Sequence, residues 1–497
     1  MTGRATIGLT MTDRICAVTS PRRQRLIASF LVTGAALFLF VLCQANQALA
    51  ADGAGTHAAQ PCALPDAAFN TAIDVHALDE YADAIARLLK QEKFSDLDCI
   101  ADAERAGKSR FSGGAWKLRY TYIGLDSPRP GHPTQEDWKK HIQLIERWRD
   151  SNSHSVTARI ALAESYVSYA WDARGDGFSD SVSDSGWKLF HERLEKAKSI
   201  LDHSAALAQQ CPDWYVAMQQ VARGESWDMA QFKALLDKAV AFEPGYQYYY
   251  RIYADYLQPK WSGEEGDPAR FAEETANRVG GDNGDTLYYL ISEGILCGCQ
   301  ESEFGHFSWP RLQKGFAALE KKYGTSLISV NAFALMASKS GDFVAADPAF
   351  KRMGDNWNKD LWVTEAFFKS ERDIAAQMAP LQAKSRAYRQ EAEANMKSAE
   401  GQAYAAEFQP KFAAYEQGCL KESKGEEAKF DFLVQVGKTG TVEDAHTEKQ
   451  PGSFSMCLMK ALYESYVKKE TPFPAPPKEE YKMILEIDPT TLNAAAK

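Results

Sequence analysis

Apolar side chains recur at intervals of three or four residues through most of the chain, from about residue 75 to about residue 405. This interval places them on one face of a helix, and breaks containing Gly, Pro or Asp separate stretches of about 10–20 residues. Almost no segment of this region alternates apolar and polar residues, so we do not expect a sheet here. The pattern predicts amphipathic helices, with apolar faces such as Ala82, Ile85, Ala86, Leu88 and Leu89, or Leu235, Leu236, Ala239 and Phe242.

Two of the predicted helices end in the same way, before Pro212 and before Pro244, 32 residues apart. This spacing is close to the period of about 34 residues in tetratricopeptide repeats, where a helix rich in small residues ends before a proline that cannot continue it. Residues 331–345 add a small-residue helix followed by a Gly-Asp turn. No segment matches the full repeat pattern. We therefore predict a mainly α fold, with an irregular tetratricopeptide-like α-hairpin array over residues 75–408.

The pattern changes near residue 409, where apolar and polar residues begin to alternate as they do in strands. A small ββαβ domain is predicted over residues 409–490, followed by a tail at 491–497. Its strands are expected at residues 430–436, 441–447 and 481–487, with a turn at Lys438-Thr439-Gly440 and a helix at 453–468. The predicted apolar face of that helix consists of Met456, Cys457, Met459, Ala461, Leu462 and Tyr466.

Residues 1–50 have the pattern of an export signal. Three arginines precede an uncharged apolar run at residues 26–43, and Ala48-Leu49-Ala50 offers small residues to a signal peptidase. We expect cleavage before residue 51, a flexible mature N-terminus at 51–74, and a periplasmic or secreted protein. The alternative is an inner-membrane anchor formed by residues 26–43, because about eighteen apolar residues are near the lower limit for crossing a bilayer.

The charge of the chain argues against nucleic acid as a partner. The formal net charge is −10, and loss of residues 1–50, with five Arg and one Asp, makes it about −14. A phosphate backbone is repelled by such an average charge, and no basic stretch with interleaved aromatic residues offsets it. The length after cleavage predicts two or three domains, because one core rarely serves so many residues.

Seven cysteines follow residue 50, an odd number that leaves at least one thiol free or paired with another chain. We predict a disulfide between Cys419 and Cys457, which would stabilise the small C-terminal domain by about 3–4 kcal/mol. Cys297 and Cys299 are too close for the usual redox motif and have no histidines at zinc-ligand spacing, so their role stays open and no metal is expected. The others are Cys62, Cys99 and Cys211.

A group of motifs resembles an uncharacterised bacterial family of secreted helical proteins. The motifs are Ala170-Trp171-Asp172-Ala173-Arg174-Gly175-Asp176-Gly177, Trp187, Cys211-Pro212-Asp213-Trp214-Tyr215, Glu243-Pro244-Gly245-Tyr246 and Leu257-Gln258-Pro259-Lys260-Trp261. The resemblance covers about residues 80–370. It implies a tetratricopeptide-like helical array and nothing about activity.

The predicted C-terminal domain resembles the C-terminal domain of TonB-type energy transducers over about residues 415–490. The resemblance rests on the ββαβ order, the segment 436–442 and the proline-rich segment 473–477. A transducer has an anchor helix and a long proline-rich spacer where this chain has its helical array. The resemblance implies a protein-contacting role, with the edge of the strand after Pro477 accepting a strand from a partner peptide.

Motifs for phosphate, calcium and catalysis are incomplete. Gly437-Lys438-Thr439 would need a glycine at the position of Phe432 to form a P-loop, so a hairpin turn is expected instead. The acidic segment 172–184 has Arg174 and Ser183 where a calcium loop needs oxygen ligands of negative charge, which favours a polar surface loop. The nine histidines include no pair at four-residue spacing, and no nucleophile elbow is present. No catalytic, cofactor or metal residue is predicted.

Aromatic residues supply the candidate contact surface. Tyr249 and Tyr253 fall on one face of a predicted helix, and Trp261 follows it. Aromatic side chains with polar tips suit a groove for a peptide or a glycan. The alternative is that the tyrosines fill the space between helical layers, with their hydroxyls reaching solvent.

These patterns predict a non-catalytic protein-binding or scaffold protein of the bacterial envelope, without cofactor, whose partners are envelope proteins or peptides. The alternative is an envelope enzyme with a site assembled from residues distant in sequence. A pocket with convergent, desolvated carboxylates or histidines would favour the enzyme, and a long open groove would favour the scaffold.

Overall fold

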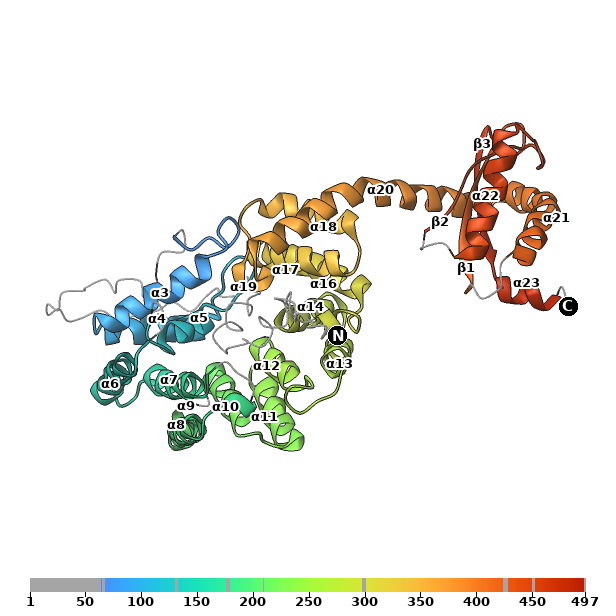
Figure 1. Ribbon diagram of the computed structural model, residues 1–497. Helices are drawn as coiled ribbons and strands as arrows, with labels where there is room; N and C mark the ends of the chain where they lie inside the picture. The colour runs from blue at the N-terminus through green and yellow to red at the C-terminus, as the bar shows by residue number, and fades with distance from the viewer. Residues whose placement is uncertain are drawn as a thin grey trace, which may run out of the picture. The chain divides into compact units, whose positions relative to one another are not determined.

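The computed structural model describes residues 64, 68–129, 133–175, 179–208, 210–296, 301–422, 428–448 and 452–495. It is mainly helical, with a small antiparallel sheet of three strands near the C-terminus. The chain divides into two compact units, residues 1–375 and 376–497 (Figure 1). The predicted signal segment 1–50 and most of residues 51–74 lie outside the described residues.

Unit 1 is entirely helical apart from its connections in the part of the chain that the structure describes. Its elements are α3 (Ala77–Lys90), α4 (Phe94–Gly107), α5 (Lys117–Leu125), α6 (Gln135–Ser151), α7 (Val156–Arg174), η2 (Ser179–Ser181), α8 (Asp184–His203), α9 (Ala205–Ala208), α10 (Pro212–Gly224), α11 (Met229–Phe242), α12 (Tyr248–Tyr256), α13 (Asp267–Val279), α14 (Gly281–Ile295), α15 (Glu301–Phe304), α16 (Trp309–Tyr323), α17 (Leu327–Lys339), α18 (Phe343–Met353), α19 (Lys359–Trp362) and the first part of α20 (Glu365–Lys397).

The helices of unit 1 form an inner and an outer set. Inner helices such as α5 and α17 are buried on all sides, every residue of α17 before Lys339 being buried. Outer helices such as α6 and α8 bury only one face, as amphipathic helices do. Helix α7 packs against α8, α14 against α13 and α16, and α17 against α18. The predicted face of α11 is buried except for Phe242, which lies at the helix end and is 42% exposed.

Side-chain caps fix where several of these helices begin. Ser155, Ser183 and Asp228 each accept a hydrogen bond from the backbone N–H three residues further on. Thr134 and Asp137 form a reciprocal capping box at the start of α6. These caps satisfy N–H groups that a helix leaves without partners at its first turn.

The connection between α4 and α5 joins the first helices to later ones. The Trp116 indole Nε1 donates to Gln247 Oε1 at 3.0 Å, and the Gly113 backbone N–H donates to the Tyr323 carbonyl at 3.1 Å. The Leu327 N–H donates to the Thr71 carbonyl at 2.9 Å. An open repeat stack has contacts only between neighbouring repeats. Unit 1 instead brings its first segments against α12, α16 and α17, so the helical array closes on itself.

Unit 2 contains the predicted ββαβ order. Its elements are the second part of α20, α21 (Ala399–Glu422), β1 (Phe430–Gly437), β2 (Val442–Thr447), α22 (Ser453–Val467), β3 (Glu480–Ile487) and α23 (Pro489–Ala495), which occupies most of the predicted tail. The strand order is β2-β1-β3, and both neighbours of β1 are antiparallel to it. The predicted turn at Lys438-Thr439-Gly440 joins β1 to β2.

Helices cover both faces of the sheet. Phe432 and Val434 of β1 pack with α21 and α22, whereas Leu433 packs with Tyr388 and Ala392 of α20. The compact unit therefore begins inside α20, earlier than the predicted boundary at residue 409. The helical periodicity of α20 and α21 gave no sign of this, because a helix that packs on a sheet has the same pattern as one that packs on helices.

The predicted disulfide between Cys419 and Cys457 is confirmed. Its Cα atoms are 5.7 Å apart, and the bond joins α21 to α22. Cys99 is also disulfide-bonded, and Cys211 is a buried free thiol. Cys62, Cys297 and Cys299 lie outside the described residues.

Candidate functional site

The strongest convergence of charged groups lies inside unit 1, on three inner helices. Arg119 of α5 makes ion pairs with Glu164 of α7 at 2.6 Å and with Asp213 of α10 at 2.5 Å. The Tyr246 hydroxyl donates a hydrogen bond to Asp213. All four side chains are buried. We call Arg119, Glu164, Asp213 and Tyr246 the central cluster.

Burial controls the ionisation of the central cluster. It raises the pKa of Glu164 to about 7, although the Arg119 guanidinium acts in the opposite direction. Burial also raises the pKa of Asp213, against the effects of Arg119 and Tyr246. Two buried carboxyl groups thus share one buried guanidinium. Because burying a charge without a counter-charge is costly, loss of any one of the three groups should be strongly destabilising.

A cavity of about 10 Å³ adjoins this cluster, lined by Arg119, Asp126, Glu164, Val167, Ser168, Ala217 and Gln220. Glu164 Oε2 and Gln220 Oε1 have no hydrogen-bond partner among the described residues. A volume of this size holds a single water molecule and no substrate. The convergent carboxylates expected of an enzyme are therefore present, but the pocket around them is too small for catalysis on a ligand.

Further buried ion pairs continue between successive inner helices. Arg223 of α10 pairs with Asp255 of α12 at 2.6 Å, and Arg251 of α12 pairs with Glu293 of α14. Ser329 of α17 donates to the same Glu293 at 3.2 Å, and burial raises the pKa of Glu293 to about 7. Each pair crosses from one helix to the next, so their role is to fix helix registry.

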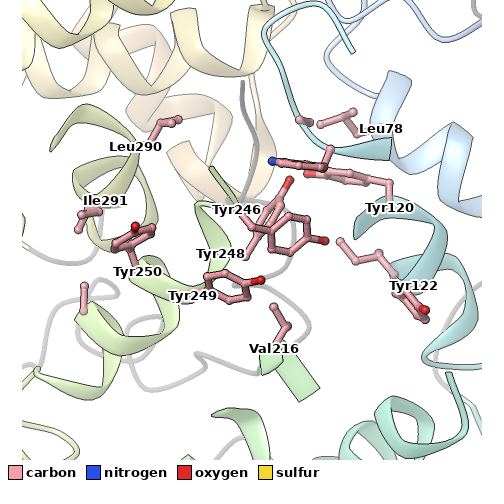
Figure 2. Packing of buried hydrophobic residues seen from close by; sticks show 14 of the residues in the cluster. Leu78, Tyr120, Tyr122, Val216, Tyr246, Tyr248, Tyr249, Tyr250, Leu290 and Ile291 are labelled. Atoms are coloured by element: carbon pink, nitrogen blue, oxygen red, sulfur yellow. The ribbon is translucent and has the colours of Figure 1, made fainter. Parts of the chain in front are cut away.

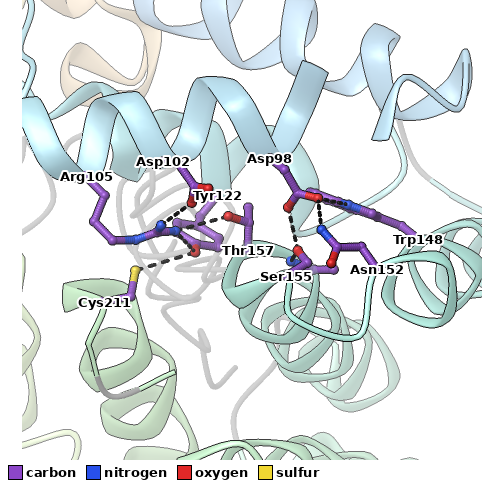
Figure 3. A network of polar contacts seen from close by, with 10 residues as sticks. Asp98, Asp102, Arg105, Tyr122, Trp148, Asn152, Ser155, Thr157 and Cys211 are labelled. Carbon is purple, nitrogen blue, oxygen red and sulfur yellow. Dashed lines mark hydrogen bonds and ion pairs between the residues drawn. The ribbon is translucent and has the colours of Figure 1, made fainter. Parts of the chain in front are cut away.

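The network in Figure 3 has the same character. Asp98 of α4 accepts hydrogen bonds from Trp148 at 3.1 Å, Asn152 at 2.8 Å and Ser155 at 2.5 Å. The Arg105 guanidinium donates to Thr157 at 3.0 Å. These bonds hold α4 against α6, α7 and the connection between them.

One group of a serine, a histidine and an aspartate contains the residue types of a hydrolase triad but not its geometry. Ser165 Oγ lies 3.3 Å from His141 Nε2, and Asp126 is nearby in the chain fold. The same Nε2 is 2.8 Å from the Leu125 carbonyl, to which only an N–H can donate. Burial lowers the pKa of His141 to about 4. A nitrogen that carries its proton toward a carbonyl cannot accept one from Ser165, so the group is structural.

The tyrosines predicted as a contact surface lie in the core. Tyr249 is 0% and Tyr253 is 5% exposed. Tyr249 lies beside Tyr246 and Tyr248 (Figure 2), and the Tyr253 ring meets the rings of Phe232 and Phe271 edge-on. Trp261 is partly buried, and its ring meets the Trp171 ring edge-on at 5.8 Å. This packing matches the alternative in which the aromatic residues fill the space between helices, but the Tyr249 hydroxyl is buried and does not reach solvent as expected. The sequence could not distinguish the two, because both place the rings at helical spacing.

The edge of β3, predicted to accept a partner strand, is lined by α20. Asn395 Nδ2 donates to the Lys482 carbonyl at 3.0 Å, and Lys482 pairs with Glu391 at 2.6 Å. Lys478 donates to Asn395 Oδ1 at 3.1 Å. These bonds occupy part of the region where an incoming strand would have to pair.

The opposite edge carries features that the sequence pattern did not indicate. Within the described ranges no strand pairs with the outer side of β2. Helix α22 exposes Met456, Tyr463, Tyr466 and Val467, which are 47–67% accessible. Met456 and Tyr466 were predicted on the buried face but are exposed, whereas Leu462 of the same predicted face is buried, together with Phe454 and Leu458. Apolar residues lie on most sides of α22, so its sequence does not show which side faces the sheet.

Other candidate features give no site. A surface depression of about 260 Å³ in unit 2 includes Arg389, whose charge is already paired with Asp431 at 2.8 Å and Glu448 at 2.7 Å. No metal-binding group of three or more His, Cys, Asp or Glu occurs among the described residues. Within that same part of the chain, no helix is both long and apolar enough to cross a membrane.

No protein-family model, curated protein or solved structure matches this chain. The two resemblances noted in the sequence therefore rest on the residues quoted for them.

Proposed function

We propose that this chain is a non-catalytic protein-binding protein of the bacterial envelope, in which a tetratricopeptide-like helical unit supports a TonB-like C-terminal unit that makes protein contacts. The observation that carries the proposal is the exposed apolar side of α22, formed by Met456, Tyr463, Tyr466 and Val467. Grouped apolar side chains on a surface characterise protein contact sites. Two of the four are tyrosines, a residue type enriched at the centres of such contacts.

The polar groups of unit 1 support a structural role for it. Ion pairs such as Arg119–Glu164 and Arg223–Asp255 are enclosed and bridge neighbouring helices. The cavity beside the central cluster has room for one water molecule. An enzyme needs a space for its substrate next to its titratable groups. The envelope enzyme is therefore the less supported alternative.

The cysteine chemistry supports export. Cys419, Cys457 and Cys99 are all disulfide-bonded, and disulfides persist in oxidising compartments such as the periplasm. The signal pattern at residues 1–50 leads to the same proposal, with anchoring by residues 26–43 as its alternative. The acidic net charge of −10 favours proteins or peptides over nucleic acids as partners.

The test is site-specific photo-crosslinking in the envelope of a producing bacterium. A photoreactive residue replaces Tyr463 in one variant and Leu189 of α8, 39% exposed, in a matched control. We expect protein crosslinks from position 463 and none from position 189. Equal crosslinking from both positions, or substrate turnover by the purified chain that Glu164→Gln abolishes, would overturn the proposal.

A further inference from the structure

We infer that the exposed apolar side of α22 and the outer edge of β2 form one interface, and that its occupant is a second copy of this chain. The inference rests on the proposed function, because it names the partner of the surface that carries that function. It depends on three relationships within unit 2: the side of α22 that is exposed, the strand beside it, and the charges along that strand.

Two of the exposed apolar side chains of α22, Tyr463 and Tyr466, point away from α21, whereas Met456 and Val467 point outward from the sheet. Cys457 faces α21 because it is disulfide-bonded to Cys419. Tyr466 lies nine residues further on, which is two and a half helical turns and so the opposite side of α22. Tyr463 is 67% and Tyr466 is 47% exposed, whereas Leu458 and Leu462 face the sheet.

The strand on that side is β2. Helix α21 lies over β3, where the Tyr404 ring meets the Tyr481 ring at 5.1 Å, and α22 packs mainly against β2. The direction from α21 to α22 therefore follows the direction from β3 to β2 across the sheet (Figure 1). Tyr463 and Tyr466 consequently lie on the side of α22 that borders the outer edge of β2, and Met456 and Val467 extend the apolar surface outward from it.

An outer edge of this kind is a template for another strand, because its backbone groups point outward. Side chains alternate along β2, so Ala445, opposite Val434, faces α22. Asp444 and His446 lie on the other face, where the His446 ring meets the Tyr388 ring at 5.2 Å. An added strand would thus meet apolar groups on one face of the sheet and charged groups on the other.

The charge pattern of β2 is complementary to itself. Asp444 and His446 contact each other within one strand, with His446 Nδ1 3.1 Å from Asp444 Oδ2. In an antiparallel pair of two β2 strands with the two-fold axis at Ala445, Asp444 of each copy also lies opposite His446 of the other, so the four side chains alternate in type around the axis. Ala445 then lies opposite Ala445 on the α22 face, where a small residue leaves space for the exposed side chains of both α22 helices. The same patch serves both copies, as a two-fold interface requires. The product is a continuous six-stranded sheet.

The first test measures the oligomeric state of the mature full-length chain by light scattering over a range of concentrations. We expect a dimer that dissociates on dilution. Tyr463→Glu places a charge in the apolar contact and should raise the dimer Kd by at least about tenfold, equivalent to about 1.4 kcal/mol. Leu189→Glu in unit 1 is the matched control and should leave the Kd unchanged. Equal melting temperatures would show that both variants fold.

The second test reverses the charges on the strand. Asp444→Lys should raise the dimer Kd about tenfold, and adding His446→Glu should restore it, because lysine and glutamate again lie opposite each other. Failure of the second substitution to restore dimerisation overturns the two-fold at Ala445. A monomer at all concentrations overturns the inference altogether. If that monomer still gives crosslinks from position 463, the proposed protein-binding function survives with a foreign strand as its partner.

Discussion

The Arg119 guanidinium lies 2.6 Å from Glu164 Oε1, and the two side chains are only 8% and 6% exposed. If one of the two charges is removed, the other stays buried and cannot be solvated by bulk water. The pair connects α5 to α7, and the same guanidinium reaches Asp213 of α10. Much of the registry of three inner helices therefore depends on one side chain.

Arg119→Met should destabilise unit 1 by about 3–5 kcal/mol, because it leaves buried carboxylates without their counter-charge. Urea unfolding followed by tryptophan fluorescence measures this specifically, since all eleven tryptophans precede residue 376. Arg87→Met on the exposed side of α3 is the control and should change little. A loss below about 1 kcal/mol for Arg119→Met would contradict this assignment.

Glu104 should make unit 1 less stable as the pH rises. Burial raises its pKa from 4.5 to about 7, although hydrogen bonds from Tyr81 and Thr121 act against this. The folded state then binds a proton at Glu104 more tightly than the unfolded state does. The resulting contribution to the free energy of unfolding is complete below about pH 4.5 and is lost as the pH rises to about 7. Glu104→Gln should reduce the fall in unfolding free energy across this window by up to about 3 kcal/mol.

The measurement is the free energy of unfolding at pH 5 and pH 8 for the wild type and Glu104→Gln. Glu80→Gln on the exposed face of α3 serves as the control. Glu164 and Glu293 also have pKa values raised to about 7, so the Glu104→Gln variant should retain part of the wild-type slope. An identical slope in both proteins would show that Glu104 titrates normally.

Replacing Cys419 and Cys457 together by alanine should cost unit 2 about 4 kcal/mol, because the bond closes a loop with a sequence separation of 38. Hydrogen exchange of the backbone amides in β1 and β3 should accelerate accordingly, while amides of α7 should not respond. Cys211→Ala removes a thiol that has no disulfide and supplies the control. Unchanged exchange in the sheet would mean that the core of unit 2 suffices without the bond.

Gly440→Ala should destabilise the turn between β1 and β2. Gly440 has a φ of +83°, and a Cβ there would clash with the Phe473 carbonyl oxygen. We expect a loss of about 1–3 kcal/mol. Gly418→Ala on α21 is the contrasting change: nothing lies within 4 Å of its added Cβ, and a gain of about 0.5–1 kcal/mol is expected. Calorimetry of unit 2 would separate the two, and equal effects would contradict the turn assignment.

The features predicted correctly from the sequence are local. The ββαβ order follows from alternation and turn residues within a few positions, and the Cys419–Cys457 bond follows from few cysteines and a small domain. The central cluster could not be predicted from the sequence. Arg119 and Asp213 are 94 residues apart, and the residues around each give no sign that the two side chains meet. Tyr249 shows the same limit, because helical spacing does not tell how many neighbours surround a helix.

The backbone hydrogen bond from Leu327 to Thr71 joins positions on the order of 250 residues apart. We call this contact between the first segment of the helical unit and α17 its seam. A stack of helices without such a seam can grow from any point and lose its ends one at a time. Here the first helices can complete their contacts only after α17 has folded. Closing so long a segment of chain costs conformational entropy and so adds to the barrier to folding. Removal of the first helices should therefore expose the turn between α16 and α17 on the far side of the same seam, and the unit should melt in one step and not in a series.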